Sequence, residues 1–305
     1  MLLSYRDRFV PVPCPACGCP DHKQAFEKYS LGYVRCADCG TVYINPRPSP
    51  EVLDIYYKNS ENYAYWNKYI FPASEDVRRE KIFKPRVRRL LEICERHRVS
   101  RDTMLEVGAG FGIFCEEVSR AGFFNRVTGI EPTPDLARTC RLKGIDIIED
   151  LVENVDLGDE KISVIASFEV IEHLFSPEDF LRKCFSLLSP GGLLVLTCPN
   201  VKGFDISVLG SVSDAVDVEH LNYFHSDSLA ALLERCGFEV IETSTPGKLD
   251  ADRVRQAVLG GRFSLEGRPF LKDVLIERWD ELGDKFQKLL SDSGLSSHMW
   301  IVAKK

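Results

Sequence analysis

From about residue 101 the chain alternates short apolar stretches with amphipathic ones, and this order constrains the fold more than any other feature. The apolar stretches have the length of strands and the amphipathic ones that of helices. Such alternation is typical of an α/β protein with a mostly parallel sheet and helices on both faces. We expect strands at 104–107, 126–131, 145–148, 162–167, 193–198, 239–243 and 299–303, and helices at 114–121, 135–143, 177–188 and 226–236.

Residues 49–98 precede this pattern and residues 247–296 interrupt it, and both segments are predicted to be helical. The first begins with a helix at Pro50 and continues through a stretch rich in aromatic side chains. That stretch either packs against the core or forms a lid over a cofactor. A basic amphipathic helix follows at about 76–98, and we expect its Arg and Lys side chains to face solvent.

Two Cys-x-x-Cys pairs lie within residues 1–48, which we predict to form a small zinc ribbon. Two intervening residues allow both sulfurs of a pair to bind one ion. The pairs flank a predicted hairpin, and a segment so poor in apolar side chains would depend on the metal for its stability. Four protein ligands leave no open position, so the zinc would be structural. The predicted ligands are Cys14, Cys17, Cys36 and Cys39.

Disulfides or a redox pair are the alternatives for these cysteines. Cys19 and His22 lie nearby but break the paired symmetry, so we leave them out of the ligand set. The remaining six cysteines share no spacing, and we interpret them as buried free thiols. They are Cys94, Cys115, Cys140, Cys184, Cys198 and Cys236.

A glycine-rich loop joins the strand at 104–107 to the next helix, with glycines at 108, 110 and 112. Glycines there allow a ligand to approach the backbone at the carboxyl end of the strand. The spacing differs from the dinucleotide pattern G-x-G-x-x-G, and the Lys-Ser/Thr pair of a phosphate-binding P-loop is missing. Glu106 would repel a pyrophosphate and instead suits a cationic ligand.

Acidic and apolar residues follow the next strands at the same predicted edge of the sheet. Glu131 is placed to accept both hydroxyls of a ribose. Asp150 can accept from an adenine amino group, with Leu151 against the ring. Phe168 and Glu169 follow the fourth strand on the same rim. Together they describe a pocket for a nucleoside with a positively charged, zwitterionic tail, which is S-adenosylmethionine.

The ordered motifs resemble those of class I S-adenosylmethionine-dependent methyltransferases over residues 100–245. The resemblance rests on the 106–112 loop, the acid at Glu131, Val-Ile-Glu-His-Leu at 170–174 and Leu-Leu-Ser-Pro-Gly-Gly at 187–192. It implies a Rossmann-like, doubly wound sheet of seven strands whose last strand, 299–303, is antiparallel, with 247–296 as a helical insertion and 99–305 as the cofactor-binding domain. Ser163 departs from the acid common at its position. The implied cofactor contacts also include Gly108, Ala109, Gly110, Phe111, Gly112, Pro132 and His173.

Together with the ribbon, the chain resembles bacterial methyltransferases of sugar-nucleotide, surface-polysaccharide and natural-product pathways, whose cofactor domains often carry a Glu-His-Leu motif after the fifth strand. Here that motif is Glu219-His220-Leu221. The resemblance implies a small hydroxylated acceptor such as a sugar nucleotide, and His220 as general base beside Glu219. His173 is the alternative base, and Asp217 and Tyr223 are possible helpers.

Composition narrows the remaining alternatives. With 39 basic and 46 acidic side chains, a formal charge of −7 argues against a nucleic-acid partner. No apolar run has the roughly 18 residues of a membrane span, and the N-terminus is no signal peptide, so we expect a cytoplasmic protein. A protein or RNA methyltransferase that docks through the ribbon, and a non-catalytic cofactor-binding homologue, stay open. The oligomeric state is not determined by the sequence.

Overall fold

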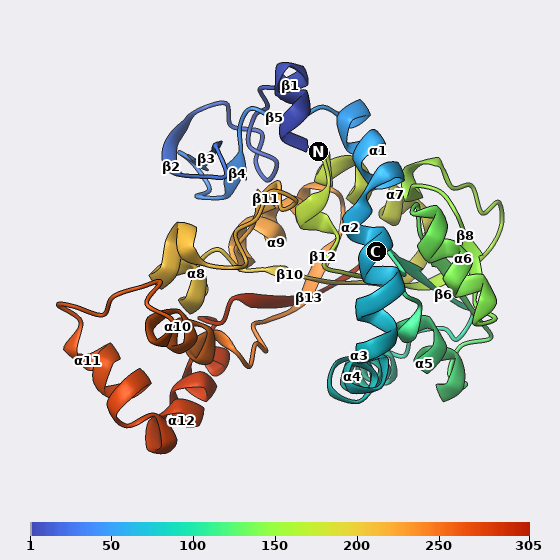
Figure 1. Cartoon of the computed structure of the whole chain (residues 1–305). Helices are drawn as coiled ribbons and strands as arrows, with labels where there is room; N and C mark the ends of the chain where they lie inside the picture. Colours follow the sequence, from blue (N-terminus) through green and yellow to red (C-terminus); the bar gives the residue numbers. More distant parts are fainter. Residues whose placement is uncertain (1) are drawn as a thin grey trace.

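A central sheet of seven strands organises the molecule, in the order β12-β13-β10-β9-β6-β7-β8 (Figure 1). The computed structural model describes residues 2–305, apart from the side chain of Tyr63. All neighbouring strands are parallel except that β13 runs antiparallel to both β10 and β12. The predicted seven-stranded sheet with an antiparallel last strand is therefore confirmed. The strands are β6 (Thr103–Val107), β7 (Arg126–Ile130), β8 (Asp146–Ile148), β9 (Ile162–Phe168), β10 (Leu188–Pro199), β12 (Glu239–Ser244) and β13 (His298–Lys304).

Helices cover both faces of this sheet because successive strand side chains point to opposite sides. Leu105 and Val107 pack in one core cluster with α7 (Pro177–Leu187) and α9 (Ser226–Arg235). Met104 packs in another cluster with α4 (Lys84–Arg96) and α5 (Ile113–Ala121). The remaining helix of the doubly wound unit is α6 (Pro134–Leu142).

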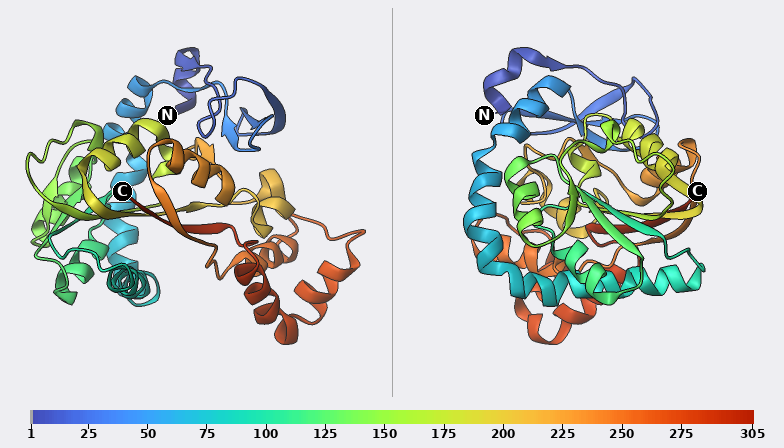
Figure 2. Two further views of the ribbon diagram at one scale, coloured as in Figure 1. Left: turned by 180° about the vertical axis from the view of Figure 1, so that it is seen from behind. Right: turned by 90° about the vertical axis from the view of Figure 1, so that its right-hand side faces the viewer.

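A continuous column of short helices connects the N-terminal strands to the sheet. In Figure 2 it descends along one side of the molecule before α4 crosses beneath the sheet. The predicted helix at about 76–98 is wrong in one respect, because the π-helical turn η3 (Arg79–Phe83) interrupts it. A second π-helical turn, η2 (Trp66–Ile70), lies earlier in the chain. The column, as we call it, contains α1 (Pro50–Asn59), α2 (Glu61–Tyr65), α3 (Phe71–Arg78) and α4.

The helices between β12 and β13 form a lobe with its own core cluster, which projects from the sheet in Figure 1. They are α10 (Asp250–Leu259), α11 (Pro269–Lys272), the turn η7 (Asp273–Glu277) and α12 (Trp279–Asp292), and α8 (Phe204–Leu209) packs against α10. Helical structure in 247–296 was predicted. None of the helices within residues 2–305 is long and apolar enough to cross a membrane.

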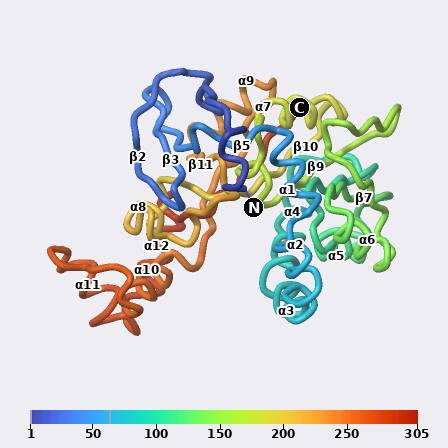
Figure 3. The backbone as a smooth tube through the Cα atoms, turned by 45° about the horizontal axis from the view of Figure 1, so that its top comes forward, coloured from blue at the N-terminus to red at the C-terminus, as the bar shows by residue number. Residues whose placement is uncertain are grey.

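The N-terminal ribbon is a sheet of β2 (His22–Lys28), β3 (Leu31–Cys36) and β4 (Val42–Ile44), to which a fourth strand is added from far along the chain. That strand is β11 (Asn222–Tyr223), and it pairs antiparallel with β4. Figure 3 shows the ribbon lying beside this segment. The sequence did not predict this pairing. Before the ribbon, η1 (Leu2–Arg8) leads to β1 (Phe9–Val10). β1 pairs antiparallel with β5 (Arg47–Pro48), which follows the ribbon.

Candidate functional site

A cavity of about 300 Å³ lies at the carboxyl ends of β6, β7 and β9. This is the edge at which ligands bind in open α/β sheets. All thirteen residues that the sequence nominated for the cofactor line it. They are Glu106, Gly108, Ala109, Gly110, Phe111, Gly112, Glu131, Pro132, Asp150, Leu151, Phe168, Glu169 and His173.

The glycine loop can form one wall of the cavity because its three glycines have positive φ angles. A Cβ atom on Gly108 would lie 2.4 Å from Val170 Cγ2, and one on Gly112 would lie 2.3 Å from Ile145 Cδ1. Both positions therefore exclude any side chain. Gly110 has open space where its Cβ would be, so the backbone there stays accessible to a ligand.

Glu131 is buried and supports the loop from the end of β7. Its carboxylate accepts hydrogen bonds from the backbone N–H groups of Gly110 (2.8 Å) and Thr133 (2.9 Å). Burial raises its pKa, while these two bonds act in the opposite direction. A carboxylate has about four acceptor sites, so it can still receive the two hydroxyls of a ribose at the cavity wall.

Glu106 is buried where β6 meets the glycine loop, and it accepts a hydrogen bond from Cys115 Sγ at 3.0 Å. Burial raises the pKa of Glu106 to about 8. A positively charged ligand would compensate for the lost hydration and favour the ionised form. The site is therefore suited to a cation, as the sequence suggested.

Asp150 and Leu151 lie at the mouth of the cavity. Asp150 Oδ1 accepts from the backbone N–H of Leu151 (2.7 Å) and from Asn154 Nδ2 (2.8 Å), which fixes the carboxylate. Leu151 leaves 41% of its surface exposed. An exposed leucine beside an oriented carboxylate can contact a purine ring and its amino group.

The column supplies cavity residues that the sequence analysis missed. Arg86 stacks over the Phe168 ring, 4.8 Å from its centroid, and lies 3.8 Å from Glu169 Oε1. Arg78 lies over Phe71, 5.4 Å from the ring centroid. The amphipathic pattern predicts that these arginines face solvent, but both line the cavity, as do Tyr57 and Phe83. The aromatic stretch thus contributes to the cavity wall. The spacing of Arg and Lys residues along a helix does not show which of these side chains points into a cavity.

Two of the nominated histidines are brought together beside the cavity. His173 lines it, and the rings of His173 and His220 lie 4.7 Å apart. Each Nδ1 lies 3.0 Å from a backbone carbonyl oxygen, of Glu219 and Ala215 respectively. A carbonyl only accepts, so Nδ1 carries a proton in both rings, and Nε2 is the atom that could take up a further proton.

These histidines have different surroundings. Burial lowers the pKa of His173 to about 4, which makes it a weak base. Nε2 of His220 lies 3.6 Å from Asp217 Oδ2, where a carboxylate can stabilise a protonated ring. Asp217 also accepts from the backbone N–H groups of Glu219 and His220. Tyr223 donates its hydroxyl to the carbonyl of Asp217.

Glu219 is turned toward the column. Its Oε1 accepts from Tyr56 (2.5 Å) and Asn62 (3.2 Å). Glu172, which the sequence analysis did not nominate, lies closer to the histidines. It is fully buried, within 4.8 Å of ring nitrogens of both, and neither carboxyl oxygen has a hydrogen-bond partner within the described part of the chain. Burial raises its pKa well above the usual range, and the nearby Glu169 acts in the same direction.

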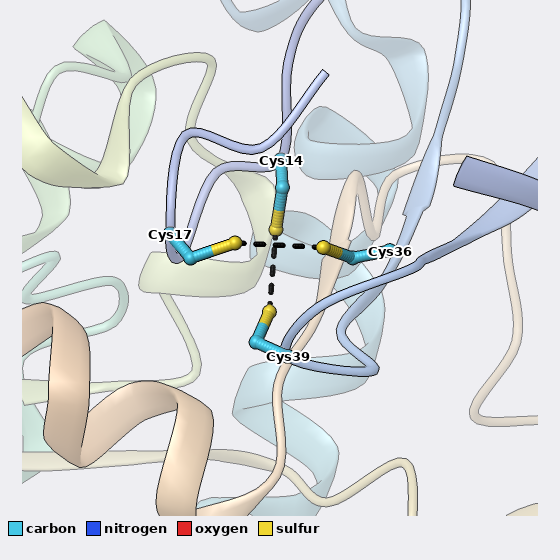
Figure 4. A group of neighbouring side chains, drawn as sticks. All are labelled: Cys14, Cys17, Cys36 and Cys39. Atoms are coloured by element: carbon cyan, nitrogen blue, oxygen red, sulfur yellow. Dashed lines mark hydrogen bonds between the residues drawn. The ribbon is translucent and has the colours of Figure 1, made fainter. Parts of the chain in front are cut away.

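The four predicted ligand cysteines converge on one point in the ribbon (Figure 4). Cys14 and Cys39 sulfurs lie 3.5 Å apart, those of Cys17 and Cys36 lie 3.4 Å apart, and all four are within 4.8 Å of one another. A tetrahedral ion with Zn–S bonds of about 2.3 Å needs sulfurs about 3.8 Å apart, so the donors fit zinc. Cys19 lies outside this group. The six scattered cysteines are buried and free, as predicted.

The fold and this cavity define a class I S-adenosylmethionine-dependent methyltransferase domain. A family model described as a methyltransferase domain matches residues 76–243, more than half of the chain, and the chain belongs to that family of enzymes.

Particular relatives support the same assignment. The chain is 31% identical over 150 residues to a probable S-adenosylmethionine-dependent methyltransferase of Mycolicibacterium smegmatis, covering 48% of this chain and 56% of that protein. It is 29% identical over 170 residues to a ubiquinone biosynthesis O-methyltransferase of Xanthomonas euvesicatoria pv. vesicatoria, covering 51% and 70%. The chain spans about half the length of most of the curated relatives it matches.

A solved S-adenosylmethionine-dependent methyltransferase from Archaeoglobus fulgidus shares the fold, with a TM-score of 0.52 and 19% identity. The match covers 78% of this chain and all of that one.

Proposed function

We propose that this chain transfers a methyl group from S-adenosylmethionine to a small hydroxylated acceptor. The observation that carries the proposal is the cavity, in which a backbone loop open to a ligand, two buried acids and a fixed carboxylate meet at one sheet edge. Each of these groups complements a different part of that molecule.

In this proposal Glu131 binds the ribose, Asp150 and Leu151 bind the adenine, and Glu106 with Arg86 binds the charged amino-acid tail. The sulfonium of the bound cofactor supplies an activated methyl group. The protein must then align the acceptor and remove its proton. His220 serves as that base, since the low pKa of His173 makes the latter a poor proton acceptor. Asp217 stabilises the charge that His220 gains.

The acceptor is proposed to be a small molecule, most specifically a sugar nucleotide or a related glycan or natural-product precursor. A relative named for O-methylation in ubiquinone biosynthesis supports the small-molecule class. The sugar-nucleotide class rests on the sequence resemblance alone. We also propose that Cys14, Cys17, Cys36 and Cys39 bind one structural zinc ion, supported by the convergence of their sulfurs.

The experiment is a calorimetric titration with S-adenosylmethionine, followed by transfer of a labelled methyl group to a panel of acceptors. The panel contains nucleotide sugars, phenolic compounds, bulk tRNA and a protein extract. Saturable cofactor binding with label in a small molecule supports the proposal. Label in tRNA or protein would replace it with the docking alternative, and absent cofactor binding would overturn it.

A further inference from the structure

Arg47 occupies an unusual position at the exit of the ribbon. It is among the largest fully buried side chains, with 1% of its surface exposed. Within residues 2–305 no carboxylate lies within ion-pair distance of it. Its partners are instead three backbone carbonyls: Nε donates to Ile44 (3.3 Å), Nη1 to Phe175 (3.1 Å) and Nη2 to Leu221 (3.5 Å). A buried cation is costly, so a guanidinium in this place requires a reason.

Its three partners belong to segments that are far apart in sequence. Ile44 ends the ribbon strand β4, Phe175 follows His173 by two residues, and Leu221 is next to His220. One planar group with fixed donor directions therefore bridges the ribbon and both histidine-bearing loops. Its guanidinium also lies over the rings of Tyr43 (5.7 Å) and Phe175 (6.0 Å), which fixes its plane.

Backbone and amide contacts around Arg47 join the same two loops. The N–H of Leu221 donates to the carbonyl of Glu172 (2.8 Å), and the N–H of Ile44 donates to the carbonyl of Leu221 (3.0 Å). Asn222 Nδ2 donates to the carbonyl of Leu174 at 2.8 Å. These hydrogen bonds help to fix the position of the two loops relative to each other.

The ribbon also holds residues 213–225, which we call the His220 loop, along its length. Lys28 donates to the carbonyls of Ser213 (2.8 Å) and Val216 (2.6 Å). Tyr33 donates to the carbonyl of Asp217 at 2.8 Å. At the far end His225 Nε2 lies 2.7 Å from the carbonyl of Cys39. Through β11, this loop also adds a strand to the β4 side of the ribbon sheet.

We propose that Arg47 is a positioning residue that sets the separation of His173 and His220, so that the ribbon completes the acceptor side of the site. Its role in transfer rests on the proposed function, but the geometric role does not. Removing the guanidinium takes away the one group that ties both loops to the ribbon at once, and leaves the two loops joined by separate hydrogen bonds such as Leu221 N–H to Glu172 and Asn222 Nδ2 to Leu174. The histidine rings should then change their relative position. The cofactor cavity should change little, because most of its wall comes from other segments and only Val170, His173 and Leu174 belong to the affected loop.

The test compares Arg47→Met, which keeps the length of the side chain but has no donors, with Arg235→Met. Arg235 also ties the ribbon to the domain, through Ala16 (2.5 Å) and Glu178 (2.9 Å), but away from the histidines. Side-chain NMR of the histidine rings is the primary readout. We expect the signals of His173 and His220 to shift in Arg47→Met only, with cofactor affinity within about twofold of wild type. In the transfer assay, kcat should fall at least about tenfold.

Unchanged histidine signals in folded Arg47→Met, or equal shifts in Arg235→Met, would overturn the inference. If Arg47→Met does not fold, Arg47→Lys carries the test, because it keeps the charge but loses the planar fork. Failure of both variants to fold would also overturn it, since Arg47 would then hold up the whole domain. An inactive wild-type protein would refute the proposed function, whereas the NMR comparison would still decide this inference.

Discussion

Glu131 has two roles at the level of a single side chain, because it supports the glycine loop and faces the cavity. We expect Glu131→Ala to weaken S-adenosylmethionine binding by about 2–4 kcal/mol, since it removes charge-assisted acceptors from the ribose. Calorimetry measures the loss of affinity, and a thermal melt checks that the variant is still folded. Glu149→Ala, an exposed acid after β8, is the control. Equal affinities for Glu131→Ala and wild type would contradict the assignment.

Glu106 gives the site a pH dependence. Its pKa is raised to about 8 by burial, so without ligand it is largely protonated at neutral pH. A cationic ligand binds the ionised form better, so binding should release a proton and strengthen as the pH rises toward 8. The binding constant can rise by at most about tenfold per pH unit, because one proton is released. Calorimetry from pH 6 to 8 tests this against Glu106→Gln, which cannot ionise. Parallel curves for the two proteins would show that Glu106 does not contact the charge.

His220 is the residue on which the proposed proton transfer depends. His220→Asn should lower turnover by about 10²-fold or more, because asparagine cannot take up a proton. Cofactor affinity should not change, since His220 does not line the cavity. His97→Asn, on the distant end of α4, controls for loss of an imidazole. Undiminished turnover in His220→Asn would leave alignment alone, or His173, to carry the reaction.

At the scale of elements, α4 brings the Arg86 cation into the cavity at the carboxyl ends of the strands. Arg86→Met should weaken S-adenosylmethionine binding by about 10- to 100-fold, because charge-assisted hydrogen bonds to its carboxylate are lost. 5′-Methylthioadenosine lacks the amino-acid tail and should bind wild type and variant equally. Arg88→Met, exposed on the same helix, should have no effect. A matching loss for methylthioadenosine would mean that Arg86 only shapes the cavity.

The elements also show which features a sequence can predict. Alternating apolar stretches placed the seven strands and the glycine loop, because period and turn chemistry are local. β10 begins at Leu188 rather than 193, and its register with β9 shifts between Leu188 and Leu193, where the Ser-Pro-Gly-Gly sequence lies. The two π-helical turns and the inward-facing Arg86 were not predicted, since they depend on what the column packs against. The short β11 was missed because its two residues become a strand only by pairing with β4.

At the scale of the whole molecule, the candidate site has a part that the sequence predicted, the cofactor side, and a part that it did not, the acceptor side. The nominated cofactor residues all lie at one sheet edge because parallel strands deliver their carboxyl ends there. The residues of the acceptor side could not be predicted from strand order in this way. It combines the ribbon, the 170–175 segment and the His220 loop, which meet through Arg47 and Leu221. Such long-range contacts leave no periodic signal in the sequence.

Removal of the metal tests whether the structure of the rest of the molecule depends on the ribbon. Because the sequence of residues 1–45 is poor in apolar side chains, it predicts that this segment unfolds without zinc and leaves the cofactor domain largely intact. Since β4 pairs with β11 and His225 contacts the Cys39 carbonyl, we now expect the effect to extend into the His220 loop. The paired change Cys36→Ser plus Cys39→Ser should abolish zinc binding, measured by elemental analysis, with one zinc per chain in wild type.

Hydrogen exchange then locates the consequence of that loss. Amides in 22–44 and 213–225 should exchange faster, whereas those in β6, β7 and β9 should keep their protection. S-Adenosylmethionine affinity should stay within about threefold, because the ribbon cysteines do not line the cavity. Cys19→Ser is the matched control, since Cys19 lies beside the cluster but outside it. Zinc retained by the double variant would refute the ligand set, and unchanged exchange in 213–225 would show that the loop keeps its shape without the ribbon.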